Sequence, residues 1–372
     1  MIDLAHYAVF ERRPDDTYIQ QWREHIKQTG SPETFDYVTM VGPSNVDRAV
    51  ILSGDIEVPL DKREDEGMVP CPLCRPRSPK FKTGRMVWFP IDRTVLFIGN
   101  KCARRHMGSE YEIADKRFKK EAGARLLSDT LAAIQERAPE LIVFARKMLP
   151  IAAALEKTKK EFHADAPKFL SFMKSEFAFQ EGKIQTTVNT GLKNQHGRLV
   201  YETRQIGTLV GGEFLVDYNA HQSIKSAIST LEAVQQPLPA WSVDDVSTHR
   251  IDEVLRIGNK AAKAVHALKD ARDYLQGARQ FVHENNLNLF NRWAALDGSP
   301  FESLNIRKTG SWLFLDVSAF FASEKAGFQM PAELFNALPN LGAAKFDLPQ
   351  FPFISRLPQV TDAQRFLRTK DR

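Results

Sequence analysis

Apolar residues recur at alternating intervals of four and three positions from residue 127 to residue 173. Thirteen of these fourteen positions are apolar and only Lys159 is polar. This spacing puts one continuous stripe on a helix and is typical of a coiled coil or a helical bundle. We call these positions the seam: Leu127, Leu131, Ile134, Ala138, Leu141, Ala145, Met148, Ala152, Leu155, Lys159, Phe162, Ala166, Phe169 and Met173. Because Pro139, Pro150 and Pro167 lie inside the segment, we expect it to be kinked or divided into consecutive helices.

A second helical stripe runs through residues 244–293, from Ile251 to Val282. The two helical segments have similar lengths and are separated by a compact stretch, which favours a long antiparallel helical hairpin resembling a coiled coil. Between them, residues 183–218 change to the period of two that is typical of strands. This intervening stretch predicts a small β-sheet carried at the end of the hairpin, followed by one more helix at 221–236.

The two ends of the chain have mixed patterns. Near the N-terminus we expect a helix at 17–27, stopped by Gly30, and short strands at 37–41 and 49–52. The Phe- and Pro-rich C-terminal segment predicts a strand at 311–317, a short helix at 331–338 and extended chain at 348–358 that docks through Phe351 and Phe353. The fold class is therefore α+β and mostly helical. Its expected domains are a small α/β unit (1–69), a basic module that leads into a helix (70–125), the helical hairpin with its β insertion (126–296) and the C-terminal α/β docking segment (297–372).

Length and composition indicate a globular protein of two or three domains. The chain has 372 residues, of which 43% are hydrophobic and 26% charged. No apolar run is long enough to span a bilayer and the N-terminus has no secretory pattern, so we expect no membrane partner. With three cysteines the chain is no disulfide scaffold, and the expected compartment is the reducing cytoplasm.

The net charge of +5 is distributed unevenly along the chain. Residues 1–70 hold 7 basic and 14 acidic side chains, a charge of −7. Residues 71–125 hold 14 basic and 5 acidic side chains, a charge of +9. All three cysteines lie in this basic stretch, which makes it the first place to look for function.

The cysteines and one histidine form two closely spaced pairs. Cys71 and Cys74 are separated by two residues, and Cys102 and His106 by three. A tight turn can present two thiolates to one ion, and a spacing of four positions places two ligands on one face of a helix. Four such ligands suit Zn²⁺, and a filled tetrahedral shell is typical of structural rather than catalytic zinc. The sequence predicts one structural zinc ion per chain.

Between the two pairs the sequence predicts a β-hairpin, with strands at 85–89 and 94–98, and then a helix for which Asn100 is the expected N-cap. This order of knuckle, hairpin and helix resembles the treble-clef zinc fingers over residues 70–108. The resemblance implies that Cys71 and Cys74 lie on the knuckle and Cys102 and His106 on the first helical turn. Members of that family bind nucleic acid, protein or zinc alone, so the resemblance leaves the function open.

The basic side chains around the expected zinc site are typical of phosphate contacts. Trp88, Phe81 and Tyr111 would stack on bases if they were exposed. Alternatively, the positive charge neutralises the acidic N-terminal segment or an acidic partner. The candidate nucleic-acid contacts are Arg75, Arg77, Lys80, Lys82, Arg104, Arg105, Lys116, Arg117, Lys119 and Lys120.

Common catalytic and nucleotide-binding motifs are missing from the sequence: it contains no P-loop, no dinucleotide fingerprint, no nucleophile elbow and no His-Glu-x-x-His. The leading hypothesis is a non-enzymatic, zinc-stabilised protein that associates with nucleic acid and uses the helical arm for dimerisation or for a protein partner. The alternative is a protein–protein adaptor in a larger assembly. A third is a hydrolase whose site is assembled from residues far apart in the sequence.

Overall fold

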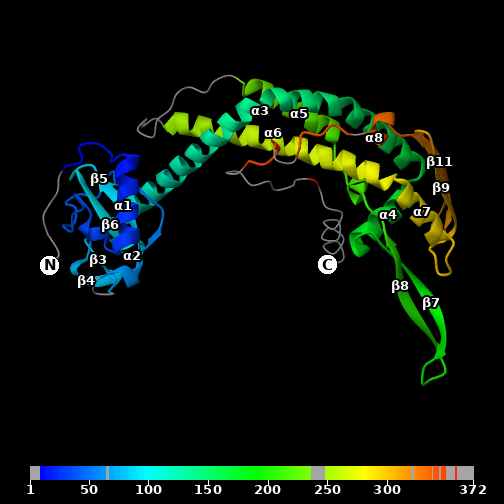
Figure 1. The fold of residues 1–372 in the computed structure, drawn as a ribbon, viewed down its shortest axis with the longest axis horizontal. Coiled ribbons are helices and arrows are strands. Elements are labelled where there is room, and N and C mark those ends of the chain that lie inside the picture. The colour runs from blue at the N-terminus through cyan, green and yellow to red at the C-terminus, as the bar shows by residue number, and fades with distance from the viewer. Residues whose placement is uncertain are drawn as a thin grey trace. The chain divides into compact units, whose positions relative to one another are not determined.

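The computed structural model describes residues 9–63, 67–235, 248–319, 322–336, 338–342, 345–348 and 357, with the backbone alone at 248–250, 333 and 335. The expected α+β class is confirmed: about half of these residues are helical and the sheets are small and antiparallel (Figure 1). The chain forms two compact units. Unit 1 comprises residues 1–126 and 239–255, and unit 2 comprises residues 127–238 and 256–372. Among the described helices, none combines the length and apolar character needed to cross a bilayer.

The central strand of unit 1 is β5 (Thr83–Phe89). Strand β6 (Thr94–Gly99) pairs with it antiparallel along one edge, as the sequence predicted. The other edge is shared by two short strands, β1 (Val50–Ile51) at one end and β2 (Ile56–Glu57) at the other. Between these two short strands, the backbone N–H of Met86 in β5 donates to the Ser53 hydroxyl at 3.0 Å, so a side chain satisfies this group.

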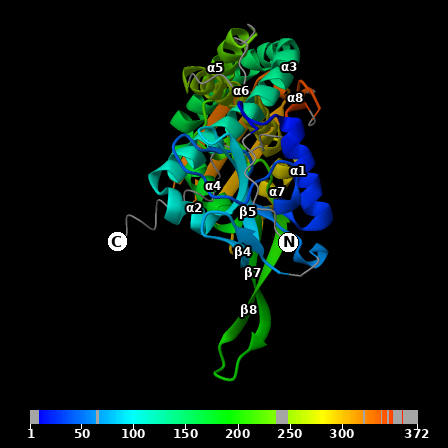
Figure 2. The same ribbon diagram turned by 90° about the vertical axis from the view of Figure 1, so that its left-hand side faces the viewer.

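Both faces of this sheet are covered. Met86, Val95 and Phe97 pack with α1 (Asp16–Thr29), whereas the alternate residues pack with α2 (Asn100–Met107) and the start of α3 (Ser109–Asp165). Figure 2 shows α1 and α2 on opposite sides of β5. Strands buried on both faces are continuously apolar, and β6 is buried at every position.

The ends of the N-terminal helix agree with the sequence. Asp15 accepts a hydrogen bond from the Tyr18 backbone N–H at 2.7 Å, and Gly30 ends the helix with φ of 64°. Two other predictions for unit 1 are wrong. Residues 37–41 form only a single bridge, at Val38, and the N-cap of α2 is Gly99. Asn100 is instead the first helical residue and bonds to other side chains.

The seam forms the core of unit 2. All of its thirteen apolar side chains are buried, with exposed fractions of 4% or less. Helix α3 continues through Pro139 and Pro150 and ends before Ala166, which is non-helical, and Pro167 begins α4 (Pro167–Gln180). Division at this point follows from the steric clash between a proline ring and a helical residue before it. The seam packs in one cluster with residues from several other elements, so a two-stranded coiled coil stays a prediction.

The expected antiparallel hairpin is wrong: the two long helices run in the same direction. Along α6 (Thr248–Phe281), Gly258 packs against Leu127, and Tyr274 contacts Lys159 further along α3. Helix α5 (Ala220–Ala233) runs back along α3, since it begins shortly after Val216, which Lys159 contacts, and its C-terminal Glu232 pairs with Arg146. Figure 1 shows α3 and α6 running in one direction and α5 running in the other. The chain thus returns along α3 as helix α5 before α6 begins. The arrangement therefore has three helices, not the two of a hairpin.

The intervening stretch forms one long ribbon. Strand β7 (Lys183–Lys193) pairs antiparallel with β8 (Leu199–Thr208), as predicted, but residues 213–216 are not a strand. Residues 213–215 belong to the 3-10 turn η3 (Gly212–Leu215), and Val216 follows it. The neighbouring residues Phe214 and Leu215 are both buried, whereas a half-buried strand would bury only every second residue.

The C-terminal part holds more regular structure than expected. The second helical segment is divided into α6 and α7 (Glu284–Ala294). An antiparallel sheet then follows, in the order β11 (Ala322–Gln329), β10 (Trp312–Ala319), β9 (Phe301–Thr309). Only β10 was predicted. The short helix α8 (Ala332–Phe335) lies within the predicted range, and the docking chain expected at 348–358 lies almost wholly outside the described residues.

Lys159, the polar seam position, has a specific set of partners. Its ammonium donates hydrogen bonds to the backbone oxygen of Val216 and to the hydroxyl of Tyr274, 3.2 Å away, and lies over the rings of Phe214 and Tyr274. Burial lowers the pKa of Lys159 to about 8. The lysine therefore joins α3 to η3 and α6, at a cost in desolvation.

Replacing Leu155 with Asp tests the core of unit 2. Leu155 is 0% exposed, so the new carboxylate would be buried without a partner, and we expect a loss of about 3–5 kcal/mol in the free energy of unfolding. Ala154→Asp is the matched control, because Ala154 is exposed and the change should cost about 1 kcal/mol or less. Urea denaturation of both variants measures the difference. Equal losses in the two variants would contradict the buried seam.

Lys159→Met tests the energetic role of the buried ammonium. Because the folded-state pKa is about 8 against an ordinary 10.5, the unfolded chain binds more protons between these values. The contribution of Lys159 to stability should therefore rise as the pH increases from 8 to 10.5. Relative to the methionine variant, the wild type should gain about 1–3 kcal/mol over that window in urea denaturation at several pH values. A difference between the two proteins that does not change with pH would contradict this.

Candidate metal centre

Two of the three thiols lie on a tight turn. Strands β3 (Val69–Cys71) and β4 (Arg75–Phe81) pair antiparallel, and the chain reverses between Cys71 and Cys74. The backbone N–H of Cys74 donates to the carbonyl of Cys71 at 3.2 Å, which closes the turn. The register of this hairpin is irregular, as expected of strands that contain several prolines.

The third thiol comes from the first turn of α2. Strand β6 ends at Gly99, and Cys102 follows on the buried side of the helix. A side chain at Gly99 would collide with the Phe81 ring, since its Cβ would lie 2.9 Å from ring carbons. Only glycine permits this close approach of α2 to β4. The backbone N–H groups of Leu73 and Gly99 donate to the Cys71 sulfur.

The three sulfur atoms form a compact cluster. The Sγ atoms of Cys71, Cys74 and Cys102 all lie within 4.8 Å of one another, and those of Cys74 and Cys102 are 3.3 Å apart. All three cysteines are free thiols. This cluster can hold a metal ion, and thiolate ligands suit soft or borderline cations such as Zn²⁺.

Burial keeps the Cys71 and Cys102 thiols in their neutral form when no cation is bound. Burial raises the pKa of the Cys71 thiol to about 12 and also raises the pKa of Cys102. Three thiolates cannot share this space without a compensating positive charge, because each would repel the others. A divalent cation would supply that charge, and the three thiols would lose their protons on binding it. The positive charge of Lys80 lowers the pKa of Cys102, but by less than burial raises it.

The structure brings together three of the four expected ligands. His106 lies on α2, one turn after Cys102, but its side chain is exposed and it is not part of the sulfur cluster. Its role as the fourth ligand therefore stays a prediction. A zinc ion held by three thiolates has room for a fourth ligand from α2 or from solvent.

The candidate phosphate contacts fall into two groups. Four of them make ion pairs: Lys82 with Glu57, Arg117 with Glu121, Lys119 with Asp115 and Lys120 with Asp252. The other six are exposed and have no ion pair with any residue that the structure describes: Arg75, Arg77, Lys80, Arg104, Arg105 and Lys116. The positive charge thus has both of the uses considered from the sequence. Part of it is neutralised within unit 1, and part is free at the surface.

Five of these six cations lie directly after the thiols in sequence. Arg75, Arg77 and Lys80 are on β4, directly after Cys74. Arg104 and Arg105 are on α2, directly after Cys102. A metal ion that links the β3–β4 turn to α2 would therefore hold these five cations in one surface.

Sequence reasoning missed a partly buried charge network at the start of α2. Arg85 of β5 donates to the carboxylates of Asp55 and Asp115, and Asn100 donates to Asp55 at 2.9 Å. The Tyr111 hydroxyl donates to the Asn100 side chain at 3.0 Å. The hydrogen bond from Arg85 lowers the pKa of Asp55. This network fixes α2 and α3 to the sheet, and no local pattern reveals it because its members are far apart in sequence.

The aromatic residues of the basic stretch serve mainly in packing. Tyr111 is only 3% exposed and cannot stack on a base, so the stacking role considered for it from the sequence is wrong. Phe81 and Trp88 are half-buried against the α1 side of the sheet. The Trp88 indole N–H donates to the Phe10 carbonyl at 3.3 Å. Of the three rings considered from the sequence, burial excludes only that of Tyr111 from stacking on a base.

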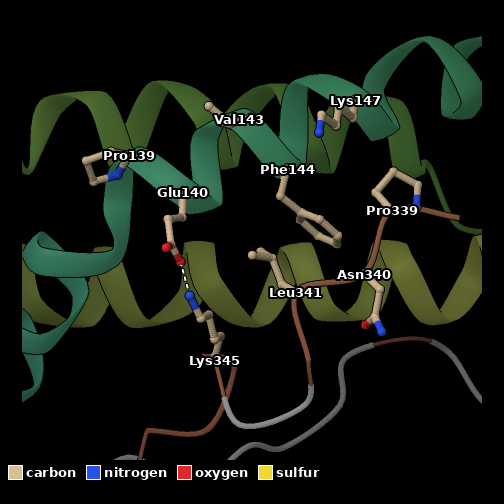
Figure 3. Close-up of a pocket in the computed structure, with 9 residues that line it drawn as sticks. All are labelled: Pro139, Glu140, Val143, Phe144, Lys147, Pro339, Asn340, Leu341 and Lys345. Carbon is tan, nitrogen blue, oxygen red and sulfur yellow. Dashed lines mark hydrogen bonds and ion pairs between the residues drawn. The ribbon is translucent and has the colours of Figure 1, made fainter.

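Unit 2 has a pocket of its own, of about 760 Å³, between α3 and the segment that contains Leu341 (Figure 3). The Phe144 ring and Leu341 point into it, and an ion pair between Glu140 and Lys345 closes one side. The described lining residues include no nucleophile with an adjacent general base. We therefore take the sulfur cluster as the candidate site.

Metal analysis tests the centre directly. Protein purified under reducing conditions should contain one zinc ion per chain, and Cys74→Ser should lose it, because removal of one thiolate from a three-sulfur cluster weakens binding sharply. Ser78→Ala on exposed β4 is the matched control and should keep the metal. In the wild type, thiol alkylation should be slow until a strong chelator is added. Metal-free protein with an unchanged melting temperature would contradict a structural zinc.

Neither the family models, nor the curated proteins, nor the solved structures with which the chain was compared contain a match to it.

Proposed function

We propose that this chain is a non-enzymatic protein that associates with nucleic acid through a zinc-stabilised basic surface in unit 1. The observation that carries the proposal is a group of exposed cations on β4, which follows the turn that holds Cys71 and Cys74, and on α2, which holds Cys102. These cations have no ion pair with any residue that the structure describes. We call Arg75, Arg77, Lys80, Arg104 and Arg105 the basic rim.

The zinc ion would act through structure. Cys71 and Cys74 lie on a turn, the β5–β6 hairpin follows, and Cys102 begins a helix. This order supports a treble-clef arrangement in which His106 completes the tetrahedron. Four protein ligands leave no open position for a substrate or an activated water. The role of the metal is then to hold β4 and α2 together and so fix the spacing of the basic rim.

The charge pattern favours phosphate as the ligand. Within unit 1, acidic side chains already form ion pairs with Lys82, Lys119 and Lys120. The basic rim stays without such partners among the described residues. Cations that bind phosphates release condensed counterions, which gives strong, sequence-independent binding at low salt. Arginine, the commonest residue of the rim, also pairs with phosphate through two hydrogen bonds.

A charge-matched pair of triple variants tests the proposal. Arg75→Gln, Arg104→Gln and Arg105→Gln together remove three unpaired cations. They should weaken binding to all nucleic acid sequences alike and lower the slope of log affinity against log salt by about 0.9 per lost duplex contact. Titration of a fluorescent duplex and a single strand at several salt concentrations measures both quantities.

The control triple is Lys82→Gln, Lys119→Gln and Lys120→Gln. It changes the net charge by the same amount but removes cations that are already paired, so the salt slope should hardly change. Equal effects in the two triples would mean that only net charge matters and that the rim is no contact surface. A wild type that binds no nucleic acid at about 50 mM salt would rule the proposal out in favour of the protein–protein adaptor.

A further inference from the structure

The β7–β8 ribbon of unit 2 extends away from the packed elements of its unit. Figures 1 and 2 both show it beyond the helices. From Thr187 to Gln205 every side chain is exposed except that of Thr190, which is half-buried. A two-stranded ribbon with both faces in water is marginally stable by itself. Its eleven- and ten-residue strands are therefore more than unit 2 needs for its own packing.

The middle of one face of the ribbon carries uncharged hydrogen-bonding groups, between Lys183 at its base and the Lys193–Leu199 pair toward its tip. The register pairs Gln185 with Gln205, Thr187 with Thr203 and Asn189 with Tyr201. Residues directly opposite in an antiparallel pair point to the same side, and alternate pairs share one face. We call these six residues the amide face. They present carboxamides, hydroxyls and a phenol, and none of them is charged, while Tyr201 also exposes its ring.

The ends of the ribbon carry positive charge. Near the tip, Lys193 and Arg198 are exposed and make no ion pair with any described residue. Closer to the base, Arg204 is paired with Glu202, the only acidic residue in 183–208, and Lys183 is paired with Glu181. Free cations at the tip and an uncharged face behind it are complementary to a polyanion whose interior carries hydrogen-bonding groups.

The base of the ribbon is firmly held. The Thr186 hydroxyl donates to the Asp297 carbonyl at 2.9 Å, and Gly207 packs closely on Leu289 of α7. Asn286 of α7 bonds to both the N–H and the carbonyl of Val210, just after β8. A ribbon mounted on rigid elements presents its face with little loss of entropy on binding.

We propose that the β7–β8 ribbon enters the major groove of duplex DNA, with the amide face toward the base edges and Lys193 and Arg198 on the flanking phosphates. The major groove of B-form DNA is about 12 Å wide and admits a two-stranded ribbon, whereas the major groove of A-form RNA is too narrow. Asn and Gln carboxamides pair with adenine through two hydrogen bonds, and Thr and Tyr hydroxyls donate or accept singly. This inference shares with the proposed function the assumption that nucleic acid is the partner, but it concerns another unit and adds sequence preference.

Selection from a library of random duplexes, followed by titration, tests the ribbon. Wild-type full-length protein should enrich a defined sequence. Gln185→Thr with Gln205→Thr should reduce its preference for that sequence over a scrambled duplex by about 10- to 100-fold, since two carboxamides are lost while strand propensity is kept. Because no charge changes, the salt slope should stay as in the wild type. Asn189→Thr, made separately, gives a second measurement of the same loss.

The matched control is Val188→Thr with Val200→Thr, which alters the opposite face by similar chemistry and should keep the preference. Far-UV circular dichroism and melting temperature show whether each variant is folded. Enrichment of no sequence by the wild type, an unchanged preference in the carboxamide variants, or tighter binding to single strands or RNA would each overturn the ribbon proposal. The basic-rim triple separates the two proposals: if it alone weakens binding and lowers the salt slope, the proposed function stands without the ribbon.

Discussion

Two-sided burial of the β5–β6 hairpin is the constraint on which the candidate site depends. Alternate residues of β5 and β6 pack under α1 on one face and under α2 and α3 on the other, so neither strand can shift without exposing apolar surface. Strand β6 therefore delivers the chain at Gly99 in a fixed position, and Cys102 follows within one turn. The packing of the unit 1 core, and not any interaction among the thiols, therefore fixes the position of Cys102 in the sulfur cluster.

The sequence predicts the local features of this fold well because their signals are local. The seam, the β5–β6 hairpin and the ends of α1 each depend on spacing within a short stretch. The direction of α6 relative to α3 depends on where the intervening chain travels, and no periodicity encodes that. Helix α5 was itself predicted, but that it runs back along α3, as the pairing of Glu232 with Arg146 shows, is tertiary information.

The same limit applies to the site. Cysteine spacing predicted the cluster of three thiols, since a turn and a helix start each fix their own geometry. Charge counting could not separate Lys120, which is paired with Asp252, from Arg104, which is unpaired among the described residues, because the partner lies more than a hundred residues away. Asn100 shows the converse: its type favours a cap, but bonds to Asp55 and Tyr111 use its side chain instead.

The two proposed contact surfaces differ in the kind of information that they can read. A rim of arginines meets phosphates, which every nucleic acid sequence presents alike, so it supplies affinity and salt dependence. The amide face lacks charge and would supply little affinity alone, but its carboxamides distinguish base edges. Because both surfaces are on one chain, binding of the basic rim to DNA would raise the effective concentration of the ribbon near the same DNA. The weakly binding amide face could then bind without any direct contact between the two surfaces. In this proposal most phosphate contacts come from the basic rim of unit 1, with Lys193 and Arg198 added near the tip of the ribbon, and the carboxamides of the amide face supply the specificity.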